Sequence, residues 1–243
     1  MAAIMTGACS KMDREHTYSV VIPSYNRYLT LLLAVRSALS QAAPPQEVVV
    51  IDDASTDERY QWLEEVVDEP RLTVIRLKEN SRVTHGVGYA IGAVRNWGLR
   101  YILAAADCPN WIAFLDDDDE WVPAKMERCF AVADEYENHR LICTNAINRR
   151  PDGTPVGYHH GVHLLEPNGE LCSVTDELLS FNPVICSTAM IGADIARQVG
   201  DQRETGFGED WDYWQRASRL TQALMINEAL AIYTIGNSKN YHY

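Results

Sequence analysis

The sequence predicts an α/β fold, a single domain with a mostly parallel central sheet flanked by helices. Short β-branched strand segments alternate with longer segments of helical periodicity, in the order βαβαβαβ. The chain has 243 residues, 47% of them hydrophobic, which is enough for one sizeable core, and nothing in it marks two independent halves. Buried strands joined through helices pair in parallel and bind ligands beyond their carboxyl ends. The residues that follow each strand are therefore the candidates for a site.

The first half of the chain contains four expected strands and four expected helices. The strands cover residues 18–23 (YSVVIP), 47–53 (EVVVIDD), 71–77 (RLTVIRL) and 111–115 (WIAFL). The helices cover residues 28–42, a segment from the cap candidates Ser55, Thr56 and Asp57 to residue 67, and residues 86–106 and 123–137. Pro123 suits the first turn of the last helix. A polar leader, residues 1–17, precedes the predicted domain at residues 18–243.

The second half of the chain carries weaker patterns. Beyond LICTNAI (141–147), residues 148–170 are rich in Gly, Pro and His and are expected to form loops or a small hairpin. A helix is expected around residues 209–220. Residues 223–234 (ALMINEALAIYT) predict a closing strand or a pair of strands.

The composition restricts the partners and the compartment. Lys+Arg 21 against Asp+Glu 34 gives a net charge of −13, which argues against nucleic acid or an anionic membrane as the main partner. The six cysteines form no C-x-x-C pair and no zinc-type spacing, so we expect free thiols. The sequence has no stretch of about 18 apolar residues and no apolar signal region at its start. We expect a soluble, cytoplasmic protein, with docking on a membrane through a partner left open.

Acidic residues follow two of the predicted strands. Asp52 and Asp53 end the second strand, and FLDDDDEW (114–121) places four aspartates and a glutamate after the fourth. Carboxylates packed this closely repel one another and raise each other's pKa values unless a cation neutralises them, and hard oxygen ligands suit Mn²⁺ or Mg²⁺. The alternative is an acidic turn in water before a helix N-terminus, where the helix dipole favours negative charge. That alternative leaves Asp52 and Asp53 at the same sheet edge unexplained.

Five motifs together resemble glycosyltransferase family 2, whose members have the GT-A fold. They are VVIPSYNR (20–27), VVVIDDASTD (48–57), RNWG (95–98), WIAFLDDDDEWVPAKM (111–126) and GEDWDYW (208–214). The resemblance covers about residues 18–235. It implies a Rossmann-like GT-A domain in which residues 18–122 bind a nucleotide-diphosphate sugar and residues 123–243 form the acceptor side.

The resemblance also implies a set of donor-binding residues. Pro23, Tyr25 and Asp53 are expected to line the nucleoside pocket. An aromatic face can stack on a base, and a carboxylate can accept from a base N–H or a ribose hydroxyl. Arg95 is expected to contact the diphosphate or the base through charge-assisted hydrogen bonds. Ordinary packing of Tyr25 and a surface salt bridge of Arg95 are the alternatives.

The D-x-D element of the family maps onto the aspartate run. Asp118 is the expected direct metal ligand, and Asp116 and Asp117 are expected at the ribose or at the metal, with Asp116 the second metal candidate. One residue of register stays open in a run of four. Family members often add a histidine after the last strand, where His242 is the substitute that this chain offers. The expected cation, Mn²⁺ or Mg²⁺, stabilises the departing nucleotide.

The pair Glu209-Asp210 fits the family's catalytic ED. By the resemblance, Asp210 is the general base that deprotonates the acceptor hydroxyl, and Glu209 and Asp212 are expected to raise its pKa. Capping of the following helix is the alternative role for Asp210. For the aromatic residues beside it, Trp211, Tyr213 and Trp214, a wall for a sugar ring and core packing are both open.

The function implied is an inverting transferase that moves one sugar, most often from UDP, to a hydroxyl on a glycan or glycoconjugate in polysaccharide biosynthesis. The Q-x-x-R-W motif of processive synthases is absent. One rival is a sugar-1-phosphate nucleotidyltransferase, which needs a Gly-rich loop bearing Arg or Lys after the first strand. The other rival is a non-catalytic module that binds a nucleotide sugar or a glycan.

Overall fold

The computed structural model describes residues 16–85, 90–158, 170–204 and 207–235. Its strands are β1 (Tyr18–Ser24), β2 (Glu47–Asp52), β3 (Leu72–Arg76), β4 (Trp111–Phe114), β5 (Glu120–Trp121), β6 (Leu141–Arg149), β7 (Pro155–Tyr158), β8 (Leu171–Ser173), β9 (Met190–Gly192) and β10 (Ala223–Thr234). Its helices are α1 (Tyr28–Leu39), α2 (Leu63–Val67), α3 (Ser81–His85), α4 (Ile91–Ala104), α5 (Lys125–Glu135), α6 (Ala193–Val199) and α7 (Glu209–Ala217), with short 3₁₀ turns η1 (Glu58–Trp62), η2 (Glu177–Leu179) and η3 (Cys186–Thr188).

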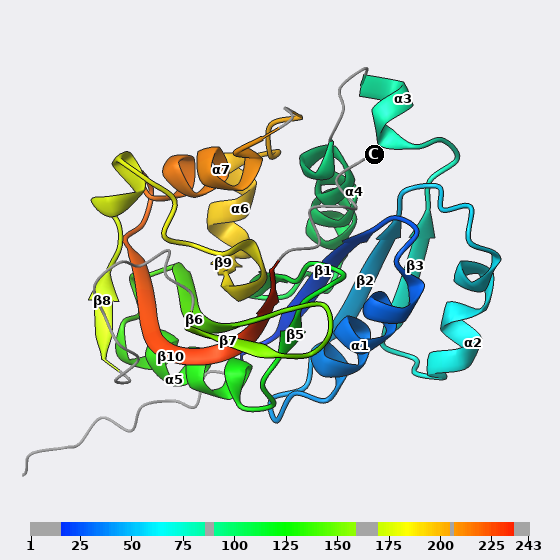
Figure 1. The fold of residues 1–243 in the computed structure, drawn as a ribbon. Helices are drawn as coiled ribbons and strands as arrows, with labels where there is room; N and C mark the ends of the chain where they lie inside the picture. Colours follow the sequence, from blue (N-terminus) through cyan, green and yellow to red (C-terminus); the bar gives the residue numbers. More distant parts are fainter. Residues whose placement is uncertain (1–15, 86–89, 159–169, 205–206, 236–243) are drawn as a thin grey trace, which may run out of the picture.

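One curled sheet runs through the molecule, and helices cover both of its faces (Figure 1). The strand order is β3-β2-β1-β4-β9-β6-β10-β5, with β7 paired to β6 and β8 to β10. The predicted α/β class is confirmed, and so is parallel pairing along β3-β2-β1-β4. The far half is mixed, because β9 runs antiparallel to both β4 and β6, while β6 and β10 are parallel.

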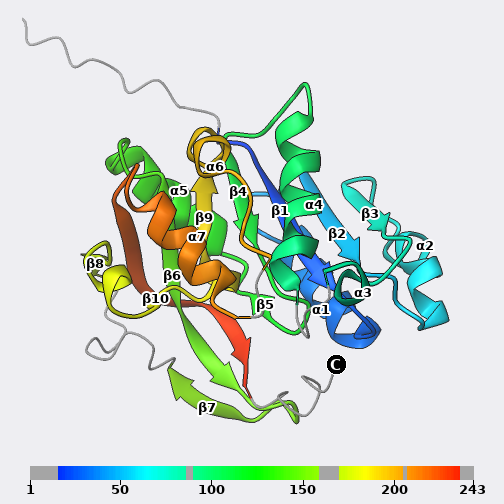
Figure 2. The ribbon, with the colours of Figure 1, turned by 90° about the horizontal axis from the view of Figure 1, so that it is seen from above.

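Alternate residues of β1 face opposite layers of the core. Val20 and Ile22 pack with α1 and α5 on one face, whereas Val21 packs with α4, α6 and α7 on the other. Figure 2 shows α4 and α7 together above the sheet. Because β1, β2 and β4 are buried on both faces, their sequences are mainly apolar runs, and each fully buried Val or Ile contributes about 1.5–3 kcal/mol.

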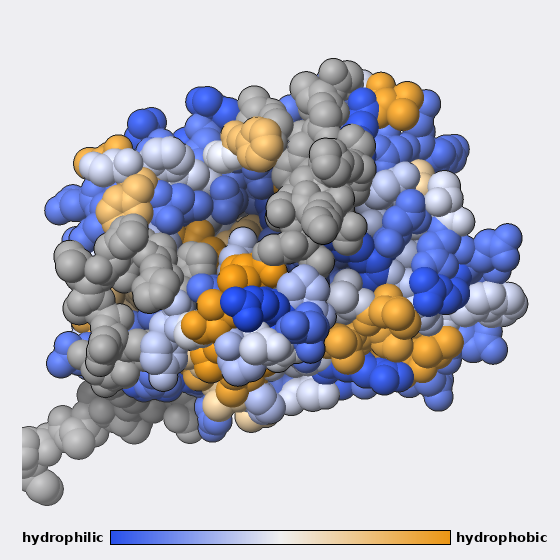
Figure 3. Space-filling model, viewed as in Figure 1, coloured by the Kyte–Doolittle hydropathy of each residue, from blue (hydrophilic) through white to orange (hydrophobic). Residues whose placement is uncertain are grey.

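Helix α1 illustrates how the sequence pattern forms this layer. Leu31, Ala34 and Val35 are spaced for one helix face and are fully buried against the sheet. Leu29 and Leu33 lie on the outer side and are 65% and 48% exposed. Figure 3 shows the resulting apolar surface over α1.

Several elements depart from the predicted boundaries. The predicted helix at residues 86–106 is shorter, because α4 runs from Ile91 to Ala104 with Ala90 as its N-cap, and the short α3 precedes it. Residues 223–234 form one strand, β10, with register shifts between Ile226 and Ala231 that bend it. The expected hairpin is present in part, because β7 folds back on β6. The predictions missed the short strands β5, β8 and β9, whose pairing partners lie far away in sequence, and the short helices α3 and α6.

The glycine of the RNWG motif has a packing role. A Cβ at Gly98 of α4 would lie 2.7 Å from a methyl of Val21 in β1. The missing side chain therefore lets α4 sit directly on the sheet, which places Arg95, one turn earlier, above the carboxyl end of β4. The described cysteines, Cys108, Cys129, Cys143, Cys172 and Cys186, are free thiols, as expected.

Candidate functional site

A cleft opens at the carboxyl ends of β1, β2 and β4, the edge that the strand pattern predicts. Its space, open solvent at the mouth included, is about 540 Å³. We call it the donor-side cleft. Its lining comprises Pro23, Ser24, Tyr25, Arg27, Asp53, Ser81, Arg82, Ala90, Ile91, Val94, Asp116, Asp117 and Asp118. The structure thus brings together all the predicted donor residues except Arg95.

Asp53 is fixed at the bottom of this cleft by the start of α3. The backbone N–H of Ser81 donates to one carboxylate oxygen at 2.7 Å, and the Ser81 hydroxyl donates to the other at 2.7 Å. The Asn80 amide adds a bond at 3.1 Å. Burial raises the pKa of Asp53, and the bonds from Ser81 oppose that rise. Asp53 is thus a rigid acceptor at the end of β2.

Tyr25 and Pro23 form the wall beside Asp53. Pro23 is buried within β1, and Tyr25, just beyond the strand, is only partly buried. The guanidinium of Arg82 lies 5.8 Å from the centre of the Tyr25 ring, a cation–π contact. Tyr25 thus lines the cleft next to Asp53, and stacking of a base on its ring stays a prediction.

The aspartate run is held partly by an arginine that the sequence interpretation did not single out. The Arg27 guanidinium donates to Asp117 at 3.1 Å and to Asp118 at 2.8 Å. The Ser24 hydroxyl donates to Asp117 at 2.6 Å. Burial raises the pKa of Asp117, and the charge of Arg27 lowers it. The signal available in the sequence was position, since Arg27 is the first cation after β1 and so lies near the edge where the acidic strand ends meet.

Asp119 points away from the cleft and anchors the loop. It is 1% exposed, accepts from the Ser187 hydroxyl at 2.5 Å and accepts from the Thr234 backbone N–H at 2.8 Å. Burial raises its pKa well above the usual range. The alternative of a solvated acidic turn is wrong, because Asp119 and the 5% exposed Asp117 are buried. The run thus presents Asp116, Asp117 and Asp118 to the cleft and uses its fourth member for structure.

Arg95 is the link between this loop and helix α7. Its side chain is only 3% exposed, and it donates to Asp116 at 2.6 Å and to Glu209 at 2.9 Å. The alternative of a surface salt bridge is therefore wrong. The bridge fixes Glu209 beside the aspartate loop, whereas a contact of Arg95 with the donor stays a prediction.

A second pocket lies on the other side of Asp116, and we call it the acceptor-side pocket. Its lining comprises Arg95, Asp116, Asn182, Val184, Ile185, Cys186, Glu209, Asp210 and Tyr233. Asp116 lines both this pocket and the donor-side cleft. The predicted catalytic pair Glu209-Asp210 therefore faces a space that adjoins the predicted donor residues.

The surroundings of Asp210 raise the pKa of its carboxyl group. Burial, and then the charge of Glu209, raise its pKa to about 6, while Arg95 acts in the opposite direction. Asp212, which was expected to help raise this pKa, pairs instead with Arg216 at 2.8 Å and with Arg203 at 3.0 Å. A pKa near 6 leaves Asp210 ionised at neutral pH and still able to take a proton.

Helix α7 does not use Asp210 as its cap. The helix begins after Gly208, whose φ of 73° suits glycine, and Asp210 accepts from the adjacent Trp211 backbone N–H at 2.7 Å. Tyr213 and Trp214 are fully buried and pack edge-on against Phe114 of β4. Core packing is thus the role of these two aromatics, and it anchors the helix that carries Asp210.

The described residues hold no preformed metal centre, since no three or more of their His, Cys, Asp or Glu side chains gather around one point. The predicted ligand His242 lies outside the described residues. Asp116 and Asp118 nevertheless offer carboxylate oxygens on one short loop. Mg²⁺ is commonly held by one or two carboxylates with substrate phosphates and water as further ligands, so this donor set fits such a cation.

Within the described parts of the chain, no helix has the length and apolar character needed to cross a bilayer.

Comparison with known proteins places these observations in a family. Over 227 residues the chain is 28% identical to the amylovoran biosynthesis glycosyltransferase AmsB of Erwinia amylovora, covering 90% of this chain and 70% of AmsB. Over 142 residues it is 32% identical to the UDP-Glc:alpha-D-GlcNAc-diphosphoundecaprenol beta-1,3-glucosyltransferase WfgD of Escherichia coli, covering 55% of this chain and 49% of WfgD.

The fold matches solved structures of S. aureus TarS. The crystal structure of TarS 1-349 superposes with a TM-score of 0.68 at 22% identity, covering 90% of this chain and 60% of that one. TarS 1-349 in complex with UDP-GlcNAc gives a TM-score of 0.67 at 21% identity, covering 91% and 59%. The model of the family described as "Glycosyl transferase family 2" matches residues 19–190. The chain, as its motifs predicted, belongs to glycosyl transferase family 2.

Proposed function

We propose that this protein is an inverting glycosyltransferase that moves a single sugar from a UDP-sugar to a hydroxyl of a glycan or glycoconjugate in polysaccharide biosynthesis. The observation that carries the proposal is the position of Asp210. This carboxylate, with its pKa near 6, lines a pocket that shares Asp116 with the donor-side cleft. A base and a nucleotide site on either side of one loop are what a direct displacement needs.

The lining of the donor-side cleft supports a nucleotide-diphosphate donor. Tyr25 offers a face for a base, and Asp53 offers fixed acceptor oxygens for a base N–H or ribose hydroxyls. Arg27 and Arg82 bring positive charge to the same cleft. UDP is the favoured nucleotide because TarS forms complexes with UDP and UDP-GlcNAc and WfgD is named for UDP-Glc.

The proposed reaction is a single displacement. Asp210 removes the proton from an acceptor hydroxyl, and the oxygen attacks the anomeric carbon of the donor sugar. The bond from that carbon to the diphosphate breaks on the opposite face, and its electron pair leaves with the nucleotide diphosphate. Attack opposite the leaving group inverts the anomeric centre.

Asp118 and Asp116 are the residues that we propose to hold Mn²⁺ or Mg²⁺. The bound cation would neutralise charge on the departing diphosphate. Both carboxylates accept from arginines in this structure, Asp118 from Arg27 and Asp116 from Arg95. These arginines keep the loop compact and partly neutral, so the chain itself prepares the cleft for an anionic ligand.

Calorimetric titration with UDP, dTDP, GDP and CDP, each with Mn²⁺ and with EDTA, tests the donor and the cation. We expect UDP to bind and Mn²⁺ to strengthen its binding, and we expect Asp118→Ala to abolish the Mn²⁺ effect. Failure of all four nucleotides to bind to the folded protein contradicts the proposal. Binding without sugar transfer to any glycan acceptor favours the non-catalytic module instead.

A further inference from the structure

The segment between η2 and η3 contributes a residue that no motif pointed to, Asn182. The turn η2, which precedes this segment, is fixed to helix α7 by two bonds to the carbonyl of Leu178, from the Trp211 indole N–H at 2.8 Å and from the Gln215 amide at 2.7 Å. Asn182 lines the acceptor-side pocket together with Asp210. The fold therefore delivers one amide side chain to the proposed base from a part of the chain 28 residues away.

The amide of Asn182 has a single consistent orientation. Its NH₂ donates to Oδ2 of Asp210 at 3.2 Å, while its oxygen accepts from the Val184 backbone N–H at 3.2 Å. Since the carboxylate can only accept and the backbone N–H can only donate, the two partners together fix which end of the amide faces Asp210.

We propose that Asn182 is a positioning residue for the base Asp210, an inference that rests on the proposed function. The Trp211 backbone N–H holds Oδ1 of Asp210, and Asn182 holds Oδ2. With one donor on each oxygen the carboxylate cannot rotate freely, and its remaining lone pairs keep one direction in the pocket. A base fixed in this way meets the acceptor hydroxyl in the reactive geometry.

The same bond affects the proton affinity of Asp210. Arg95 and the Trp211 backbone N–H oppose the rise in the pKa that burial and Glu209 cause. A donor to a carboxylate stabilises the ionised form, so the Asn182 amide, bonded to Oδ2, is expected to act in the same direction. Loss of the amide donor should therefore raise the pKa of Asp210. Truncation of a residue that only packed would instead admit water and lower this pKa, because burial is its largest cause.

The variants Asn182→Asp and Asn182→Ala test this role. Asn182→Asp keeps the shape and the acceptor for the Val184 N–H, but it loses the donor and adds a like charge. We expect both variants to lower kcat by about tenfold or more and to move the midpoint of the kcat pH profile upward, further for Asn182→Asp. The Kd for UDP, measured by calorimetry, should stay unchanged. Asn138→Ala, at an exposed asparagine, is the matched control.

The outcomes separate this inference from the proposed function. A wild-type pH midpoint in both Asn182 variants overturns the positioning role, even if their melting temperatures fall, provided that Asp210→Asn is inactive. Transfer at the wild-type rate by Asp210→Asn overturns the proposed base itself. An upward shift of the midpoint with unchanged UDP affinity supports the positioning role.

Discussion

The donor-side cleft and the acceptor-side pocket are built in different ways. Most of the cleft lining lies at or just beyond the ends of β1, β2 and β4, where short local motifs determine it, and α3 and the start of α4 supply the rest. The acceptor-side pocket combines α4, the aspartate loop, residues 182–186, the start of α7 and the end of β10. Parallel strands align their ends by their own pairing, whereas the pocket depends on the packing of remote segments.

The two regions meet at Asp116, which lines both and is bound by Arg95. Arg95 in turn binds Glu209, next to the proposed base Asp210. The loop that faces the donor and the helix that carries the base therefore share one buried guanidinium. Substitutions on either side should still affect different steps, nucleotide binding on one side and turnover on the other.

The largest effect is expected for Asp210→Asn. The amide keeps the shape but cannot accept the acceptor proton, so turnover should fall by at least about 10²-fold while the Kd for UDP stays unchanged. Steady-state transfer assays and calorimetry on the same preparation measure the two quantities. Asp212→Asn, on the same helix and paired to arginines outside the pocket, is the control. Loss of UDP binding in Asp210→Asn would break the separation between the two sites.

The pH dependence of transfer should follow Asp210. Only the ionised carboxylate accepts a proton, and its pKa is raised to about 6. The rate should therefore rise with pH through about 6, and at pH 5 it should be roughly a tenth of its plateau. UDP affinity over the same range separates this effect from Asp53 and Asp117, whose pKa values burial also raises. A flat kcat between pH 5 and 7 contradicts the assignment.

The sequence predicted the cleft better than the pocket, for a physical reason. Asp53 and the aspartates after β4 were located because strand periodicity and a terminal charge cluster are both local signals. The sequence did not show that Asp119 turns inward, since its partners Ser187 and Thr234 lie far along the chain. Asn182 lies in a short segment without periodicity, and β9 is another such segment. Their roles depend on contacts with remote parts of the chain, which the local sequence does not show.

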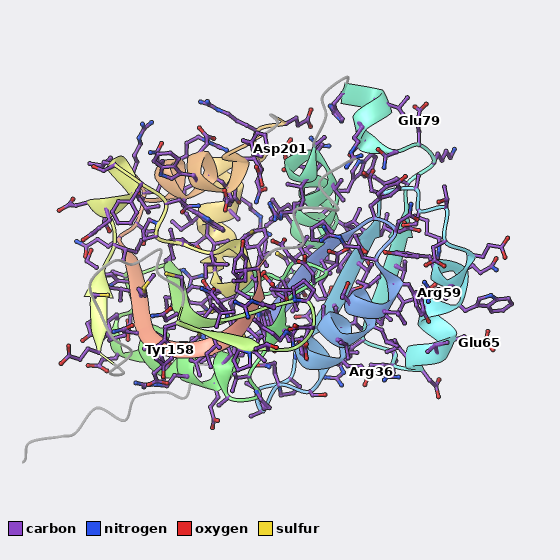
Figure 4. All side chains as sticks on the ribbon, in the orientation of Figure 1. Arg36, Arg59, Glu65, Glu79, Tyr158 and Asp201 are labelled. Carbon is purple, nitrogen blue, oxygen red and sulfur yellow. The ribbon has the colours of Figure 1, made fainter. Side chains whose placement is uncertain are left out.

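A smaller effect is expected for Arg27→Gln, and it should be confined to the donor side. Without Arg27, Asp117 and Asp118 lose a shared counter-charge, so UDP should bind about fivefold more weakly in EDTA, roughly 1 kcal/mol. The loss should shrink in Mn²⁺, because the cation replaces the missing charge. Arg36→Gln is the matched control, since Arg36, labelled in Figure 4, lies exposed on α1. An equal loss with and without Mn²⁺ contradicts this role for Arg27.

The smallest effect is expected for Lys125→Met, and it concerns the free energy of unfolding of the protein. Lys125 lies behind the aspartate loop. This lysine is fully buried, with its ammonium 4.6 Å from the centre of the Trp121 ring, and burial lowers its pKa from 10.5. Between the folded pKa and 10.5 the unfolded chain binds more protons at this site, so this group's contribution to stability rises with pH in that window. Lys125→Met removes the penalty and should raise the free energy of unfolding by about 1 kcal/mol at pH 7, and by less at pH 10.

Urea unfolding of the wild type and Lys125→Met at the two pH values measures this difference. Subtracting the free energies of the two proteins cancels the contribution of every other titrating group.

The same variant also tests whether UDP binding on the donor side depends on the contacts behind the aspartate loop. Lys125 supports the loop from behind through Trp121, whose indole N–H donates to the Ser187 carbonyl at 2.6 Å, while the Ser187 hydroxyl donates to Asp119. If the cation itself holds that chain of contacts, Lys125→Met will weaken UDP binding below the folded pKa of Lys125 and not above it. If only the packed stem does so, stability will change and UDP binding will not.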